Sequence, residues 1–335
     1  MAIVVVNPNP VFDRTISLPE LVPGTVMRTH DVEVTAGGKG INVARVLRSL
    51  GDPVHLIVPV GREDHAAYRR LLDAEDAHAT TFEVSGTVRV ASIYRESAVG
   101  RVSVVNDAGF ALPIGEWRDF IAFVESKVRA GDLVLIMGSL PTGLPNDAAA
   151  WLVDAMNSRG AFTLVDTAPQ WLATALEARP NVVAPNVHEA AVTLADASSS
   201  VFDDSSLSHD QARTQALEYA HEIASRTGHL ACVTAGAAGV AYVLDDRSGW
   251  VEAPMIDLVS AVGAGDSFVA GLASKWHAQL ADGREPDWDE AVAFGVACAA
   301  ASCEVVRAGG ADPARVGALA DLVDVVQPIG QVVSP

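Results

Sequence analysis

The most informative stretch of this 335-residue chain is Ser260-Ala261-Val262-Gly263-Ala264-Gly265-Asp266-Ser267-Phe268-Val269-Ala270-Gly271. The small residues Gly263, Ala264 and Gly265 let backbone N–H groups approach a ligand, and an apolar run with helical spacing follows them. The pattern predicts a turn that leads into the N-terminus of a helix. Unpaired N–H groups and the helix dipole favour a phosphate there, or the charge on a phosphoryl group in transfer.

Asp266 is the unusual residue of this stretch, because a carboxylate repels phosphate. Its presence is explained if it accepts a proton from an attacking hydroxyl group, as a catalytic aspartate does in phosphoryl transfer. The alternative is that Asp266 caps the helix and that the glycines only turn the chain.

The composition narrows the classes of partner. The chain carries 42 Asp and Glu against 23 Lys and Arg, a formal net charge of −19, which argues against a general affinity for nucleic acid or an anionic membrane. The longest run of small apolar residues, 291–303, is too short to span a bilayer. The N-terminus resembles a first strand more than a signal peptide, and three cysteines without metal-like spacing suggest buried thiols. We therefore expect a cytoplasmic protein.

Hydrophobic patterning predicts an α/β fold. Strands and helices alternate along most of the chain, which indicates a mainly parallel sheet with helices on both faces. The strands are expected at 3–6, 54–60, 133–137, 162–165, 182–184, 230–234, 240–244 and 250–253, and the helices at 41–51, 62–77, 148–157, 171–178 and 313–325. Residues 196–210, rich in Ser and Asp, are expected to form a mobile surface loop.

A second, smaller sheet is predicted from short strands that lie apart from this rhythm. These strands are expected at 11–18, 32–34, 84–94 and 101–106, and the last two form a hairpin that turns near Gly100. We expect them to build a lid from residues 13–35 and 84–107 on a single domain that spans 1–335. A partly apolar lid sheet would be covered most simply by the lid of a second copy, which predicts a homodimer.

Two motifs carry a family resemblance. Ala36-Gly37-Gly38-Lys39-Gly40-Ile41-Asn42-Val43-Ala44 and Val262-Gly263-Ala264-Gly265-Asp266-Ser267 together resemble the two signatures of the ribokinase-like sugar kinases, the phosphofructokinase B family. The stretch 7–13 resembles the family's first strand and its sugar-binding aspartate, Asp13. The loop 138–145, which contains Ser139, is similar to one in the branch of 1-phosphofructokinases and tagatose-6-phosphate kinases.

The resemblance implies a three-layer α/β/α sandwich with a β-sheet lid, and an enzyme that uses ATP and Mg²⁺ to phosphorylate a hydroxymethyl group on a sugar or sugar phosphate. Asp13 and Asn42 are suited to hydrogen-bond vicinal sugar hydroxyls, while Gly37 and Gly38 let the backbone approach the ring; ordinary turn chemistry is the alternative.

The nucleotide side is expected around a different set of residues. Asn186-Val187-His188-Glu189 matches the family's Asn-x-x-Glu element, in which Glu189 would hold Mg²⁺ through water; a helix-capping pair is the alternative. The strand that ends at Thr234, with Gly236 and Gly239 after it, would let the nucleotide lie against the backbone. Ser260 is also expected on this side.

Basic residues suggest that the acceptor already carries a phosphate. Arg28 and Arg89, each expected on a lid strand, resemble by position the arginines that grip the substrate's phosphate, and Lys39 would assist. On a chain with a net charge of −19, a cluster of basic side chains suggests that it binds an anionic ligand. The alternative is that they are solvated strand residues at a sheet edge.

Three other functions remain open at this stage. Ala184 and Ala261 stand where the family often has Lys and Thr, which leaves room for a non-catalytic nucleotide or sugar sensor. Kinases of unphosphorylated sugars and of nucleosides share the fold. An intact Asp266 favours an enzyme, because a sensor has no use for a base there.

Overall fold

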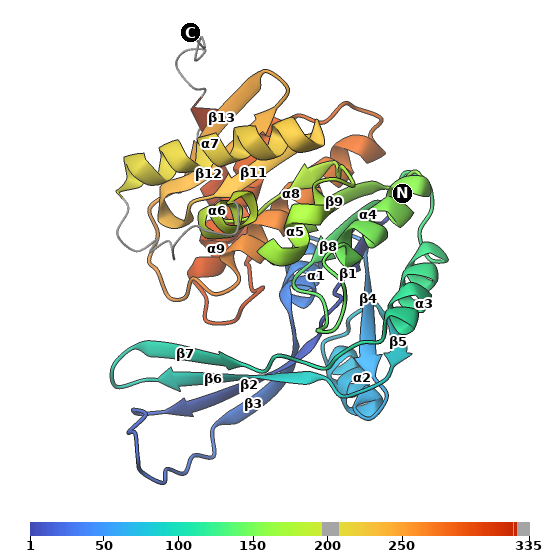
Figure 1. Cartoon of the computed structure of the whole chain (residues 1–335). Helices are drawn as coiled ribbons and strands as arrows, with labels where there is room; N and C mark the ends of the chain where they lie inside the picture. The colour runs from blue at the N-terminus through green and yellow to red at the C-terminus, as the bar shows by residue number, and fades with distance from the viewer. Residues whose placement is uncertain (196–207, 324, 327–335) are drawn as a thin grey trace.

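The structure, a computed structural model, describes residues 1–195, 208–323, 325 and 326. Within these residues ten strands form one sheet in the order β14-β13-β12-β11-β10-β9-β8-β1-β4-β5, and four more form a second sheet in the order β3-β2-β6-β7. Figure 1 shows the second sheet extending away from the body of the molecule as a lid. The predicted α/β class, with a mainly parallel sheet and a small lid sheet, is confirmed.

The strands of the large sheet run in parallel from β5 to β11 and turn antiparallel beyond it. They are β1 (Ile3–Val6), β4 (Val54–Gly61), β5 (Ala79–Val84), β8 (Leu133–Met137), β9 (Phe162–Asp166), β10 (Val182–Val183), β11 (Leu230–Thr234), β12 (Gly239–Leu244), β13 (Arg247–Glu252) and β14 (Val325–Val326). The lid strands are β2 (Val11–Leu18), β3 (Val32–Gly37), β6 (Arg89–Glu96) and β7 (Arg101–Asn106).

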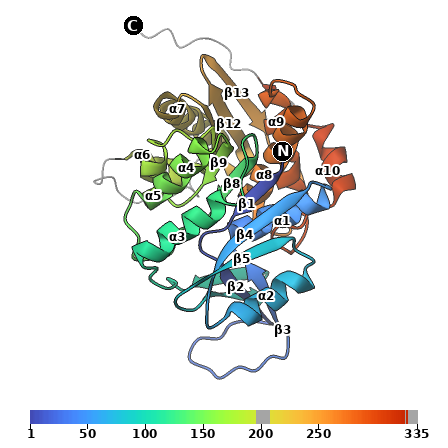
Figure 2. The ribbon, with the colours of Figure 1, turned by 90° about the vertical axis from the view of Figure 1, so that its right-hand side faces the viewer.

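Helices cover both faces of the large sheet, as Figure 2 shows edge-on. One face carries α3 (Ile114–Glu125), α4 (Ala148–Ser158), α5 (Pro169–Ala175), α6 (Val187–Leu194) and α7 (His209–Thr227). The other carries α1 (Lys39–Ser49), α2 (His65–Ala74), α8 (Ala264–Ala281) and α9 (Trp288–Cys303), with α10 (Pro313–Ala320) packed on α9.

This double cover explains why the strands read as continuous apolar runs. Side chains alternate between the faces of a strand, so both sets must be apolar when both faces are buried. In β1, Val4 and Val6 enter the core beneath α3 and α4, whereas Ile3 and Val5 enter the core beneath α1 and α8. Parallel strands also bring their carboxyl ends to one edge of the sheet, where the site lies.

The lid is a twisted four-stranded sheet with β2 and β6 in parallel at its centre. Its two outer strands expose several valines, namely Val32, Val34, Val102, Val104 and Val105, each 40–58% exposed. Gly100 adopts a left-handed φ of 63° beside the hairpin turn, as predicted.

Two predictions about elements were wrong, and a third can be compared only at its last residues. Val84 does not belong to a lid strand, because it ends β5 at the edge of the large sheet, and the lid strand begins only at Arg89. Val325 does not end a helix, because α10 stops at Ala320 and Val325 pairs with β13. The loop expected at 196–210 lies mostly outside the described residues, and its last part, from Ser208, already caps and begins α7.

Two global expectations can be compared with the described residues. Cys232 and Cys298 are buried and Cys303 is partly buried, and all three are free thiols, as predicted. None of the described helices combines the length and the apolar character needed to cross a membrane.

Candidate active site

The stretch around Asp266 folds as a turn that opens a helix, as the sequence predicts. Gly263 is the N-cap of α8 with a left-handed φ of 84°, which glycine adopts at little cost. The Ala264 N–H donates to the Ala261 carbonyl at 3.3 Å, whereas no acceptor among the described residues takes the N–H groups of Gly265 and Asp266. These two N–H groups, not that of Ala264, are the unpaired donors of this helix end.

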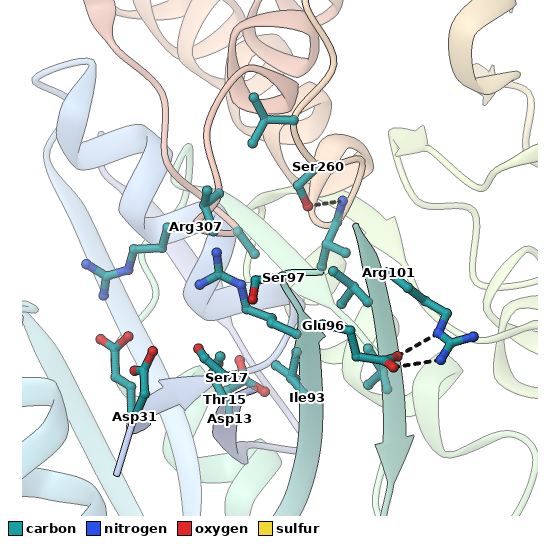
Figure 3. A pocket seen from close by; sticks show the side chains of 18 of the residues that line it. Asp13, Thr15, Ser17, Asp31, Ile93, Glu96, Ser97, Arg101, Ser260 and Arg307 are labelled. Atoms are coloured by element: carbon teal, nitrogen blue, oxygen red, sulfur yellow. Dashed lines mark hydrogen bonds and ion pairs between the residues drawn. The ribbon is translucent and has the colours of Figure 1, made fainter. Parts of the chain in front are cut away.

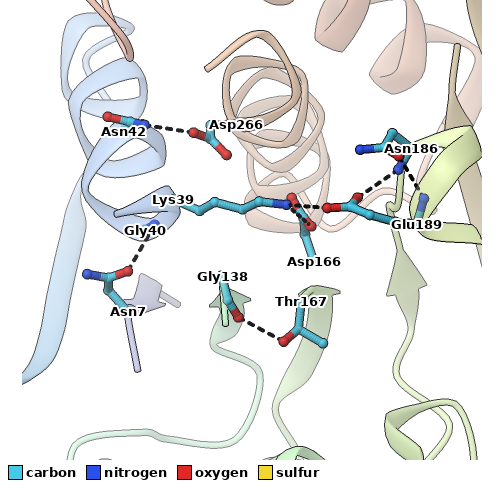
Figure 4. A network of polar contacts seen from close by, with 10 residues as sticks. All are labelled: Asn7, Lys39, Gly40, Asn42, Gly138, Asp166, Thr167, Asn186, Glu189 and Asp266. Atoms are coloured by element: carbon cyan, nitrogen blue, oxygen red, sulfur yellow. Dashed lines mark hydrogen bonds and ion pairs between the residues drawn. The ribbon is translucent and has the colours of Figure 1, made fainter. Parts of the chain in front are cut away.

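Asp266 is not the helix cap, so the capping alternative is wrong. It is the third residue of α8, and its side chain makes no capping hydrogen bond. The residue is only 6% exposed, and its Oδ2 accepts a hydrogen bond of 2.8 Å from Asn42 Nδ2 (Figure 4). Burial raises the pKa of the Asp266 carboxyl, while the charge of Lys39 and the Asn42 hydrogen bond oppose that rise.

Lys39 crosses from α1 to the other side of the sheet edge, where two carboxylates receive it. Its Nζ lies 2.7 Å from Asp166 Oδ1 and 3.1 Å from Glu189 Oε1. Burial opposes the charge of Lys39, but the carboxylates outweigh it and raise its pKa. Lys39 therefore pairs with Asp166 and Glu189. The sequence predicted instead that Lys39 would assist Arg89 in a cluster of cations.

Asp166 was missed by sequence reasoning. It ends β9, is 3% exposed, and burial raises the pKa of its carboxyl against the opposing charge of Lys39. A carboxylate directly after a buried parallel strand is the signal that could have found it, because such strand ends converge on one edge.

Asn186 and Glu189 form a complete capping box at the start of α6. The Glu189 N–H donates to Asn186 Oδ1 at 2.8 Å, and the Asn186 N–H donates to Glu189 Oε2 at 3.0 Å. The capping geometry weighed as an alternative is therefore present. Glu189 nevertheless keeps its Oε1 for Lys39, so the same carboxylate fixes a helix end and faces the site.

The glycines of the first motif make room for the buried Asn7 side chain and the half-buried Asp13 side chain. A Cβ on Gly37 would overlap the Asp13 carboxylate, and a Cβ on Gly38, whose φ is 115°, would lie 2.8 Å from the Asn7 amide. Asn7, which was not selected from the sequence, accepts from the Gly40 N–H at 3.3 Å. The glycines thus let the start of α1 sit directly on Asp13 and Asn7.

Asp13 faces a cavity of about 710 Å³ between the lid and the body of the molecule (Figure 3). Burial raises the pKa of its carboxyl to about 6, although Arg45 and Arg89 lower it. The lining includes Arg95 of the lid strand β6, Arg45 of α1, Ser260 before α8 and Arg307 after α9. Ser260 therefore lies in the same cavity as Asp13, the residue expected to hold the sugar.

Arg89 lies on the lid strand β6, as predicted, and its charge acts on Asp13. The Nη2 of Arg89 donates to the Asn9 carbonyl at 3.2 Å, and its buried Nε has no partner among the described residues. Asn9 in turn donates to Ser139 Oγ at 3.1 Å, which places Ser139 near Arg89. Arg28 lies in the exposed loop between β2 and β3, not on a strand, so its predicted placement was wrong.

The residues expected on the nucleotide side lie at the end of β11. Thr234 ends that strand and forms a bridge with Asn186, so the two meet as predicted. A Cβ on Gly236 would meet nothing within 4 Å, which leaves open space there. A Cβ on Gly239 would overlap the Val251 carbonyl, so this glycine is explained by the packing of β12 on β13.

Comparison with known proteins identifies the family of the chain. The family model described as "pfkB family carbohydrate kinase" matches residues 7–315. The chain belongs to the pfkB family. A pfkB kinase is an ATP-dependent carbohydrate kinase, so this protein is an enzyme of that class.

Two curated relatives and one solved structure illustrate the likeness. A 1-phosphofructokinase of Xanthomonas campestris pv. campestris is 32% identical over 275 residues, 81% of this chain and 83% of that protein. A 1-phosphofructokinase of Escherichia coli strain K12 is 28% identical over 265 residues, 79% of this chain and 80% of that protein. The crystal structure of phosphofructokinase-2 from Escherichia coli with potassium has a TM-score of 0.83 at 24% identity, covering 96% of this chain and 98% of that one.

Proposed function

We propose that this pfkB kinase transfers the γ-phosphoryl group of ATP to a hydroxymethyl group of a sugar phosphate, in the manner of a 1-phosphofructokinase or a tagatose-6-phosphate kinase. One observation carries the proposal: Asp266 is buried at the start of α8 beside the unpaired N–H groups of Gly265 and of its own backbone. A base and an anion site thus lie side by side.

In this proposal Asp266 removes the proton from the attacking hydroxyl as its oxygen bonds to the γ-phosphorus, while the bond from that phosphorus to the β,γ-bridging oxygen breaks and ADP leaves. The N–H groups at the start of α8 stabilise the charge on the transferring phosphoryl group, because they are fixed and already free of acceptors. The raised pKa of Asp266 makes it a stronger proton acceptor than an exposed aspartate. The proton stays on Asp266 until the product leaves.

The sugar would lie in the cavity under the lid. Asp13 lines this cavity and would orient the hydroxyls of the sugar. Asn42, hydrogen-bonded to Asp266, and the Gly37-Gly38 backbone, next to Asp13 and Asn7, would lie close to the ring. The finding that favours a phosphorylated sugar is Arg89, a half-buried residue near Asp13 whose buried Nε has no partner among the described residues. A phosphate oxygen would satisfy that donor through a charge-assisted hydrogen bond.

ATP would lie over Thr234, Gly236 and Asn186, with its γ-phosphate toward Asp266. Glu189 suits Mg²⁺ as a hard oxygen ligand. Among the described residues no group of three or more His, Cys, Asp or Glu is placed to hold a metal, which fits an ion held mainly by nucleotide phosphates and water. When bound, Mg²⁺ would neutralise charge on the phosphates.

A substrate panel tests the proposal. We expect ATP turnover with fructose 1-phosphate, fructose 6-phosphate or tagatose 6-phosphate to exceed turnover with free fructose, ribose or adenosine. The Asp266→Asn variant should lose at least about 100-fold in kcat with little change in sugar binding. Faster turnover of a free sugar or of adenosine would favour the corresponding branch of the family. Specific binding of ATP or sugar without any turnover would favour the sensor.

We also propose that residues 1–335 act as one kinase domain, and that two copies pair through their lids. The valines exposed on β3 and β7 support this pairing, since a sheet with apolar side chains on its outer strands is prone to associate. The pairing would also hold the lid over the cavity that contains Asp13.

A further inference from the structure

The side chain that orients Asp266 is itself oriented from behind. Asn42 Nδ2 donates to Asp266 Oδ2 at 2.8 Å, and Asn42 Oδ1 accepts from Arg45 Nη1 at 2.9 Å. Asn42 and Arg45 are three residues apart on α1 and therefore lie on one face of it. Because an arginine only donates and an ionised carboxylate only accepts, this arrangement permits one orientation of the Asn42 amide.

Arg45 is held in turn by a carboxylate from another helix end. Glu75, the C-cap of α2, receives Arg45 in a two-pronged pair, with Nε to Oε2 and Nη2 to Oε1 both at 2.7 Å. Arg45 is 10% exposed and Glu75 14%, so solvent screens the pair little. The same arginine also donates to the Ala36 carbonyl at 2.6 Å, just before the glycine motif.

Arg307 completes the support from the loop that follows α9. Its Nη2 lies 2.9 Å from Glu75 Oε1. The same loop packs against both Asn42 and the turn before Asp266. A Cβ on Gly309 would lie 2.7 Å from the Asn42 carbonyl oxygen, and a Cβ on Gly263 would lie 3.1 Å from Ala308 Cβ. Figure 3 shows Arg307 reaching from this loop at the rim of the cavity.

We propose that Arg45, fixed by Glu75 and Arg307, is the positioning residue of the catalytic base: it holds the Asn42 amide so that Nδ2 faces Asp266 and leaves Oδ1 of that carboxylate for the substrate hydroxyl. The inference rests on the proposed role of Asp266. Arg45 acts through Asn42 and makes no contact with the phosphoryl group in this scheme.

The experiment compares Arg45→Met with the full-length wild type. Loss of the Arg45 guanidinium frees the Asn42 amide to turn. We therefore expect kcat to fall about 10-fold or more while KM for ATP stays within about 2-fold. Glu75→Gln should show the same pattern more weakly, and it gives a second variant if Arg45→Met does not fold.

A matched control separates positioning from simple bracing. Arg315 makes an equivalent two-pronged pair with Glu304, at 2.6 and 2.7 Å, between α10 and the end of α9. Arg315→Met should change stability without changing kcat. If Arg45→Met or Glu75→Gln lowers stability and leaves kcat unchanged, Arg45 is only a brace between α1 and α2.

The pH profile of kcat in Glu75→Gln gives a second readout, because loss of the Glu75 charge would lower the pKa of Asp13 and so could not by itself move the acid limb to higher pH. Charged groups face Asp266 from four elements: Lys39 of α1, Glu189 of α6, Asp166 of β9 and Asp13 of β2. None of these residues is replaced in Glu75→Gln, and Arg45 keeps its charge there. Loss of the oriented Asn42 donor should raise the pH at which activity appears on the acid side, and an unchanged acid limb would overturn the proposal.

A crystal structure of Arg45→Met tests the geometry independently of turnover. We expect the Asn42 amide to leave Asp266. An Asn42 amide still 2.8 Å from Asp266 would refute the positioning role whatever the substrate. A wild type without kinase activity on the sugar panel would instead refute the proposed function, so the two failures are distinguishable.

Discussion

At the scale of single residues, the cavity under the lid concentrates groups whose charge is disfavoured by burial. Asp13, which lines this cavity, and the neighbouring Arg89 are both half-buried; burial raises the pKa of Asp13 and lowers that of Arg89, although each charge favours the other. Neither group is fully compensated by the protein alone. Such pairs occur where a ligand supplies the missing partners.

Arg89→Ala tests the phosphate grip. We expect the KM for a sugar phosphate to rise by an amount worth about 2–3 kcal/mol, because a charged hydrogen-bond donor is lost, with KM for ATP nearly unchanged. Arg14→Ala, on the opposite face of the lid and exposed, removes the same charge as a control. Steady-state kinetics with fructose 1-phosphate and with free fructose measure the effect. An equal loss for free fructose would remove the phosphate from the explanation.

Asp13→Asn should change how stability depends on pH. The pKa of Asp13 rises from its ordinary 3.8 to about 6 in the folded chain, so the folded state holds the proton more tightly than the unfolded state. That contribution is complete below about pH 4 and is lost as pH rises through 6. The variant should therefore gain up to about 3 kcal/mol in unfolding free energy, relative to wild type, between pH 4 and pH 7.5. Urea unfolding at several pH values measures it, and a pH-independent difference would contradict the expectation.

The sequence predicted the local structure around a site residue correctly where the residues that determine it are adjacent in the chain. Gly263 to Asp266 predicted a helix start with an acidic residue because turn, dipole and apolar spacing occur within one stretch. Asp166 and Glu75 could not be found that way. Their partners Lys39 and Arg45 lie 127 and 30 positions away, and only the folded sheet and helix ends bring them together.

At the scale of elements, Gly265 leaves open space beside the first turn of α8. A Cβ on Gly265 would meet nothing within 4 Å, and its backbone angle does not require glycine. The fold alone does not explain why alanine is absent there. Close approach of a phosphate would.

The Gly265→Ala variant tests whether glycine is needed here for the fold or for the close approach of a phosphate. Alanine favours helix over glycine, so we expect the variant to gain up to about 1 kcal/mol in unfolding free energy. The added methyl should nevertheless lower kcat/KM for ATP, because it enters the space of the phosphoryl group. Gly317→Ala in α10 is the control, since its Cβ would also meet nothing within 4 Å and it lies outside the site. A Gly265→Ala enzyme as active as wild type would show that the space is unused.

Elements were predicted well when their patterns were strong and poorly when neighbours decided them. The buried face of α7 is made largely of alanines, with Ala212, Ala216 and Ala220 in one line, which gives a weak apolar signal in the sequence. The two-residue strand β14 exists only because β13 offers an edge for it. Neither could be derived from local propensity.

At the scale of the whole molecule, the lid has a face on each side of its sheet. Asp13, Thr15 and Glu33 line the cavity, so by alternation Val34 points away from it, whereas Val104 lines the cavity. Sequence reasoning gave the existence of the lid but not which valines it exposes, because this depends on the strand register.

Val34→Asp and Val104→Asp test the two faces for pairing. We expect the wild type to sediment as a dimer at micromolar concentration and at least one variant to sediment as a monomer, since a buried carboxylate disfavours association. Leu322→Asp, at a residue 67% exposed on the body of the molecule, is the control and should leave the mass unchanged. A monomeric wild type in analytical ultracentrifugation would contradict lid pairing.

The central position of β1 has a consequence for synthesis of the chain. Ile3 pairs with Val54 on one side and with Leu133 on the other, so the first strand stays unpaired on one edge until residue 137 has left the ribosome. The face that α8 covers with Phe268, Leu272 and Trp276 stays exposed longer still. A nascent chain therefore carries most of its parallel sheet before its catalytic base is made. During that interval we expect this uncovered apolar face to be what a ribosome-associated chaperone binds.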